Sequence, residues 1–244
     1  MKKLPLKSLL GAAACLVAAT ASATPVLLME SGLTNGQSTT SLILPIQSGA
    51  ANYWAGLQTL SIDNAIGALA FCVDPWEWSP TTKQSYLTSS LDGVFGTTKA
   101  NYIRELYSES YASTLKLNNG GANAAAAFQL ALWEIVADGD LKLDGSGLVR
   151  TTNQTTQNLV SLANGMLNQI DGQFGSNNYS FTFYTSGKSG GVGSSAGYQD
   201  YLVATQVPAS LAANAVDEPG SALLLATALG GLGLFGRRRK AKPA

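Results

Sequence analysis

The chain has 244 residues, with 15 basic and 15 acidic side chains, so its formal net charge is zero, and it contains no histidine. The missing histidine excludes Ser-His-Asp triads, Cys-His pairs and most zinc sites. The two cysteines are Cys15, which lies in a segment that we expect to be removed, and Cys72. A single remaining thiol in an exported protein cannot close an internal disulfide, so Cys72 needs another explanation.

Residues 1–23 carry the three parts of a secretory signal. Three lysines precede the apolar stretch at residues 9–19, and Ala21-Ser22-Ala23 is a small-residue cleavage site. We therefore expect export through the inner membrane, cleavage after Ala23 and loss of Cys15.

The other end of the chain is also marked. Residues 220–236 are apolar but shorter than the roughly 20 residues of an ordinary membrane-spanning helix, and the basic tail at residues 237–244 should stay cytoplasmic. Together with Glu218 and Pro219, this arrangement resembles the PEP-CTERM sorting signal of Gram-negative bacteria, with Asp217 in place of its first proline. The resemblance implies processing by an exosortase and a cell-surface or extracellular location. It limits membrane contact to the C-terminal segment before processing.

Between these ends, residues 24–208 are long enough for one domain, and residues 209–219 form a linker that ends in the sorting motif. Without the basic residues of the two ends, 7 basic and 15 acidic residues remain, a net charge of about −8. An acidic domain argues against nucleic acid or an anionic membrane as its partner.

Apolar alternation predicts strands at both ends of the domain, and helical spacing predicts three helices between them. The strands are expected at 24–30, 41–45, 59–63, 68–73, 179–183 and 198–205, and the helices at 99–113, 122–138 and 153–173. Residues 53–57 fit either a short helix or a loop, and Asn35-Gly36 marks a turn. This order predicts an α+β fold in which both ends of the chain complete a sheet or barrel subdomain around an inserted helical subdomain.

Two stretches suggest ligand sites only weakly. Gly187-Lys188-Ser189 lacks the earlier glycine of a phosphate-binding loop, because Thr182 stands there, so we interpret it as a hairpin loop. Residues 138–145 resemble a calcium loop, but Lys142 falls among the ligand positions and turn chemistry explains the aspartates. We expect neither a metal nor a cofactor.

The predicted helix at 122–138 carries one unusual residue. Gln129 lies one turn from Trp133 on a face that we expect to be buried, where an unpaired polar group is costly. Taken singly, Cys72 could be a small buried thiol and Gln129 a hydrogen-bonded core amide. Together they suit another chemistry: a thiolate can attack a carboxamide, expel ammonia and leave an internal thioester. Such a bond needs shielding from water, which Phe71, Phe128 and Trp133 could provide.

The two segments A-F-C-V at 70–73 and F-Q-L-A-L-W at 128–133 resemble the signature segments of bacterial Cys-Gln thioester domains. Gln129, Ala131 and Trp133 match the second segment, while Phe128 replaces its threonine. The resemblance implies a thioester-domain-like fold, with a Cys72–Gln129 cross-link where the barrel and helical subdomains meet. It further implies a surface or matrix protein, not an enzyme, that bonds covalently to amine groups of an unknown partner in adhesion or biofilm attachment.

Two alternatives remain open from the sequence. One is a non-covalent structural protein of the exopolysaccharide matrix, with Cys72 as a buried free thiol. The other is a carbohydrate-active enzyme that uses a pair of carboxylates, beside the aromatic loop around Trp76 and Trp78. Its candidate acids are Asp74, Glu77, Glu134 and Asp138.

Overall fold

The computed structural model describes residues 24–44, 49–117, 120–152, 155–172, 178–186 and 197–208. Ala23, Glu218, Pro219, the apolar segment, the basic tail and the loop at 187–189 lie outside these residues, so the expectations placed on them stay predictions. Within the described ranges, no helix is both long and apolar enough to cross a membrane.

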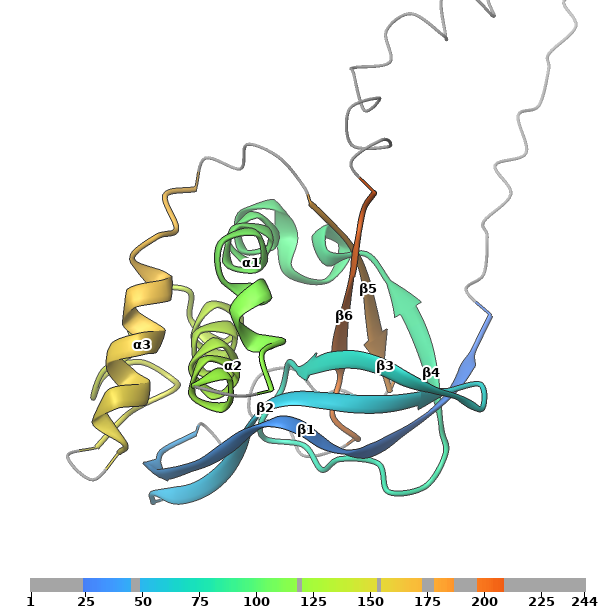
Figure 1. Cartoon of the computed structure of the whole chain (residues 1–244), viewed down its shortest axis with the longest axis horizontal. Helices are drawn as coiled ribbons and strands as arrows, with labels where there is room; N and C mark the ends of the chain where they lie inside the picture. The colour runs from blue at the N-terminus through green and yellow to red at the C-terminus, as the bar shows by residue number, and fades with distance from the viewer. Residues whose placement is uncertain are drawn as a thin grey trace, which may run out of the picture.

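Six antiparallel strands close into a barrel, in the order β1-β2-β3-β6-β5-β4 (Figure 1). They are β1 (Val26–Leu42), β2 (Ala51–Ile62), β3 (Ala65–Cys72), β4 (Gln84–Ser89), β5 (Tyr179–Thr185) and β6 (Tyr201–Gln206). The late strands β5 and β6 fit between β3 and β4, so segments from both ends of the described chain complete one barrel, as the order of predicted elements indicated.

Three helices lie between β4 and β5 in the sequence and beside the barrel in space (Figure 1). They are α1 (Leu91–Thr114), α2 (Gly121–Ala137) and α3 (Gln157–Leu167). The middle helix, α2, packs against both other helices and against β1 and β2. The protein is therefore an α+β fold in which a helical block is inserted into a barrel.

The start of α2 depends on two glycines. Gly120 has a φ of +91°, which favours glycine. A Cβ on Gly121 would lie only 1.6 Å from the carbonyl oxygen of Lys116. The helix then continues with three fully buried alanines at positions 125, 126 and 127. Most residues after them in α2 are also buried, so the helix is covered on nearly every side. Small side chains let neighbouring elements approach the helix axis closely, which suits a helix packed on several sides.

The turn predicted at Asn35-Gly36 is wrong, because β1 continues through both residues. Gly36 pairs with Gly56 across the ladder, and a Cβ on Gly36 would lie 2.3 Å from the carbonyl oxygen of Ala55. The glycine therefore permits a close approach of two strands. The Asn35 amide donates to the carbonyls of Thr114 and Lys116, at 2.7 and 2.9 Å, and so binds the end of α1.

Other elements differ in their limits. Helix α1 begins at Leu91, earlier than predicted, because Ser90 caps it by accepting a hydrogen bond from the Gly93 N–H at 3.2 Å. Gly96, with a φ of 71°, kinks its first turns. Residues 53–57 belong to β2, and α3 is shorter than predicted. Strand β4 was not predicted, because its sequence is largely polar and Tyr86 is its one buried residue.

An aromatic cluster fills the space where the helices meet the barrel. The closest pair in it is Phe71 from β3 and Phe128 from α2, with ring centroids 4.5 Å apart. Tyr107 and Tyr111 of α1 pack on both rings. Because Phe71 precedes Cys72 and Phe128 precedes Gln129, this cluster fixes the relative positions of the strand end and the helix that carry the candidate site.

Candidate functional site

Cys72 is the last residue of β3. It pairs with Tyr201 at the start of β6, and its side chain is a free thiol with 1% of the residue exposed. The next residue, Val73, donates its N–H to the carbonyl of Asp200 at 2.9 Å. The thiol is thus held at the seam where an early strand meets the last one.

Gln129 and Trp133 reach this strand end from successive turns of α2. The Gln129 Nε2 donates to the Cys72 carbonyl oxygen at 2.6 Å, and the Trp133 indole N–H donates to the same oxygen at 3.2 Å. Both residues are buried, with 0% and 1% exposure. The structure therefore places side by side two residues, Cys72 and Gln129, that are 57 positions apart in the sequence.

The Gln129 amide is only half satisfied. Its Oε1 is buried and has no hydrogen-bond partner among the described residues. An unsatisfied buried acceptor costs about 1–3 kcal/mol. This cost is as large as, or larger than, what the single hydrogen bond from Gln129 contributes to holding α2 against β3. The unpaired oxygen belongs to the carbonyl whose carbon a thiolate would attack.

The surroundings of Cys72 favour the neutral thiol over the thiolate. Burial raises its pKa well above the ordinary value, and the nearby charge of Asp74 raises it further, while hydrogen bonds from the Asp74 backbone and the Trp133 side chain lower it. A thiol in this state is a poor nucleophile until a base removes its proton. Any reaction with Gln129 therefore requires proton transfer as well as proximity.

The three aromatic residues predicted to shield the thiol lie in two places. Trp133 bonds directly to the Cys72 carbonyl. Phe71 and Phe128 belong to the aromatic cluster, and alternation along β3 points Phe71 to the face opposite Cys72.

Two tyrosines on the barrel were missed by the sequence analysis. Tyr86 and Tyr201 are buried, and their rings are 6.3 Å apart. Burial raises the pKa of both hydroxyls, with a smaller contribution from Cys72, and Tyr201 pairs with Cys72 across the β3–β6 ladder. The available signal was weak: Tyr201 falls in a predicted strand, but Tyr86 falls in the strand that was not predicted.

The candidate carboxylates separate into two groups. Asp74 and Glu77 form a buried group with Asp200, whereas Glu134 groups with Asp138 and Asp140. Within each group, one carboxylate oxygen from each residue lies within 4.8 Å of the others. Burial raises the pKa of Glu134 to about 10, and the neighbouring Asp140 and Asp138 contribute to the increase. The sequence analysis did not single out Asp200.

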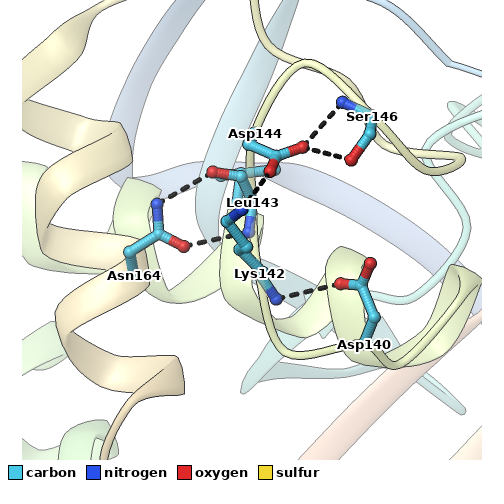
Figure 2. Close-up of polar contacts among 6 residues, drawn as sticks. All are labelled: Asp140, Lys142, Leu143, Asp144, Ser146 and Asn164. Carbon is cyan, nitrogen blue, oxygen red and sulfur yellow. Dashed lines mark hydrogen bonds and ion pairs between the residues drawn. The ribbon is translucent and has the colours of Figure 1, made fainter.

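The stretch that resembled a calcium loop is a set of turns (Figure 2). Asp144 accepts hydrogen bonds from the backbone N–H and hydroxyl of Ser146 and pairs with Lys142 at 2.8 Å. Asp140 accepts the Lys142 N–H at 3.0 Å. Asn164 of α3 exchanges two hydrogen bonds with the backbone of Leu143, at 2.9 and 2.8 Å, and so attaches α3 to the loop. These contacts account for the aspartates as turn and ion-pair residues.

No protein-family model matches the sequence, and no curated protein matches it. Among solved structures, the chain is similar to the N-terminal domain of the Streptococcus pyogenes pilus tip adhesin Cpa. The sequence identity is 16%, the TM-score is 0.38, and the match covers 75% of this chain and 94% of that chain. A likeness at this level does not establish a common function.

Proposed function

We propose that this protein forms an internal thioester between Cys72 and Gln129 and uses it to bond covalently to an amine-bearing partner. One observation carries the proposal: the Gln129 carboxamide is held against Cys72 by a 2.6 Å hydrogen bond between two buried residues. Holding two reacting groups in a fixed, productive geometry can supply about 7–11 kcal/mol of the barrier to such a reaction.

The formation step is a balanced acyl transfer. The Cys72 Sγ gives up its proton and attacks the Gln129 Cδ, the C–S bond forms, and the C–N bond breaks. The departing nitrogen takes up the one proton that the thiol gave up and leaves as ammonia. The Cys72 carbonyl accepts a hydrogen bond from that nitrogen and so orients the amide, while the Trp133 indole N–H donates to the same carbonyl oxygen.

The second step gives the protein its activity. A primary amine of the partner attacks the same carbon, forms an amide with the former Gln129 acyl group and releases the Cys72 thiol. The event happens once per molecule, without turnover, so the protein is not an enzyme. Cys72 and Gln129 are almost completely buried, and Trp133 and Tyr201 lie beside Cys72. This burial supports protection of the acyl group from water.

The predicted ends of the chain supply the setting. With a signal removed after Ala23 and a sorting motif at Glu218-Pro219 read by an exosortase, residues 24–208 would form the thioester domain of a surface or extracellular protein in a Gram-negative bacterium. In that setting, covalent capture of an amine suits adhesion or attachment of the biofilm matrix.

Methylamine tests the second step. The purified protein is incubated with methylamine in an amine-free buffer, digested, and the peptide that contains Gln129 is analysed by mass spectrometry. We expect one methylamide at Gln129 and none in the variant Cys72→Ala. An unmodified Gln129 in the native protein, under conditions in which the peptide is well covered, overturns the proposal.

A second candidate is a non-covalent structural protein of the matrix, and the intact hydrogen bond from Gln129 to the Cys72 carbonyl favours it. In that case the amide pins α2 to β3 and the thiol stays protonated and buried. A thiol reagent then titrates one Cys72 per chain after unfolding, without prior exposure to any amine. In the thioester case the freshly purified protein, unfolded in acid where the ester survives, gives substantially less than one thiol per chain.

A further inference from the structure

Three buried carboxyl groups gather next to the Cys72 strand end. Asp74 and Glu77 belong to the loop after β3, and Asp200 is the residue before β6. They are 4%, 4% and 5% exposed, and one oxygen from each lies within 4.8 Å of the others. Three like charges at this spacing, away from water, strongly disfavour full ionisation unless something compensates them.

The backbone holds these groups in place without satisfying them. Asp74 Oδ1 accepts the Asp200 N–H at 2.7 Å, and Asp200 Oδ1 accepts the Ser186 N–H at 2.8 Å. The other Asp74 oxygen and both Glu77 oxygens are buried and lack a partner at hydrogen-bond geometry among the described residues. The two ion pairs of the described chain, Arg104–Asp92 and Lys142–Asp144, lie elsewhere.

The donor set determines which ligand fits. Three carboxylates offer up to six oxygens and no nitrogen or sulfur, which is the preference of a hard divalent cation. Burial raises the pKa of all three carboxyls, and the neighbouring carboxylates raise the pKa of Asp74 and Asp200 further. A bound cation would offset that increase, because its positive charge favours the ionised form of each carboxyl group.

We propose that Asp74, Glu77 and Asp200 bind a divalent cation of the calcium class. The buried oxygens of Asp74 and Glu77 that make no hydrogen bond are the atoms that would contact the cation, and the hydrogen bonds to Asp74 and Asp200 hold the site in place. Because Val73 and Asp200 are already joined across the β3–β6 seam, the cation would fasten the closing strand β6 to the end of β3. This proposal does not depend on the thioester: a chain that never forms the bond still binds the ion.

Glu77→Gln is the central variant for the test. The substitution keeps the shape of the side chain and removes one charge, and the amide oxygen of the variant can still accept hydrogen bonds at this position. Asp92→Asn removes one exposed carboxylate that pairs with Arg104 and serves as the matched charge control. Asp140→Asn reports on the other acidic group.

Binding is measured on the full chain after treatment with a chelator. Terbium is the probe, since buried Trp76 lies next to Glu77 in the sequence and can sensitise its luminescence, and calcium is the competitor. We expect saturable terbium luminescence that calcium displaces, an increase in the thermal unfolding midpoint with calcium, and binding weakened at least about tenfold in Glu77→Gln because a charged ligand is lost. Asp92→Asn and Asp140→Asn should bind as the parent does.

Three results overturn the proposal. One is that the parent chain gives no terbium luminescence and that calcium does not raise its thermal unfolding midpoint. A second is equal binding by the parent and Glu77→Gln. The third is loss of binding in Asp140→Asn alone, which would assign the ion to the Glu134 group. None of these results bears on methylamine incorporation at Gln129, so failure of the cation site is distinguishable from failure of the thioester.

Discussion

Replacing Gln129 with methionine should change the stability of the fold in opposite directions under the covalent and non-covalent accounts. Methionine has a similar length, favours helix and fits irregular core space. It cannot form a thioester, and it leaves the Trp133 hydrogen bond to Cys72 in place. The free energy of unfolding of this variant therefore reports on what the amide contributes.

If the amide stays intact in the parent chain, the substitution removes one hydrogen bond and one orphaned acceptor. The hydrogen bond from Nε2 contributes about 0.5–1.5 kcal/mol, whereas the buried, unpaired Oε1 costs about 1–3 kcal/mol. The two effects nearly cancel, with the larger one favouring the variant. The non-covalent account therefore predicts Gln129→Met to be equal to the parent or more stable by up to about 2 kcal/mol.

If a thioester joins Cys72 and Gln129, the substitution also removes a covalent loop. The two residues are 57 positions apart, and closing a loop of that length lowers the entropy of the unfolded chain by the equivalent of about 4 kcal/mol. The thioester account therefore predicts Gln129→Met to be less stable than the parent by about 2–4 kcal/mol.

Urea unfolding in amine-free buffer measures the difference. Gln58→Met is the matched control. Gln58 is also buried with an unpaired Oε1, but it lies on β2, where it is the ladder partner of Ala70 on β3 and not of Cys72. The double variant with Cys72→Ala should be no less stable than either single variant, since one cross-link can be lost only once. A parent and a Gln129→Met variant of equal stability, or additive losses in the double variant, would refute the thioester reasoning.

Three further predictions concern the surroundings of the site. Glu134 holds a proton in the folded state up to its raised pKa of about 10, so stability should fall as pH rises above its ordinary pKa, by up to about 1.4 kcal/mol per unit. Glu134→Gln should flatten that slope in urea unfolding between about pH 6 and 9, and an unchanged slope would contradict the assignment. Trp133→Phe removes the 3.2 Å hydrogen bond to the Cys72 carbonyl and should lower the free energy of unfolding by about 1 kcal/mol. In the thioester account it should also speed the appearance of free thiol in water. An unchanged rate would contradict a shielding role for the indole. Gly121→Ala should destabilise the fold by about 2 kcal/mol or more, because its Cβ would lie 1.6 Å from the Lys116 carbonyl oxygen. Gly165→Ala is the control and should be neutral or stabilising, because its Cβ would meet nothing within 4 Å. Equal urea unfolding midpoints for the two variants would contradict this prediction.

Elements with strong local patterns could be predicted from the sequence. Helix α2 was located within one residue at each end, because glycines precede it and alanine, leucine and glutamate fill it. The order of strands and helices indicated a barrel with an inserted helical block. The meeting of Cys72 with Gln129 was inferred from two short motifs and from the chemistry of the pair, not from any local pattern.

Features that depend on distant contacts could not be predicted. Asn35-Gly36 has the local chemistry of a turn, yet the glycine serves a close crossing with Gly56 and the asparagine binds carbonyls at the end of α1. Strand β4 is polar because one face of it is exposed. Asp200 stands 126 positions from Asp74, so only folding brings it to the acidic group.

The mass of the freshly purified protein, compared with that of Cys72→Ala, tests the central claim most directly. Both chains undergo the same processing, so the comparison cancels any uncertainty about their ends. The account predicts that the parent is lighter than its sequence by one ammonia, beyond the difference made by the substitution, and that Cys72→Ala keeps its full amide mass. A parent with the full mass of an intact Gln129 and a native thiol at Cys72 would contradict it.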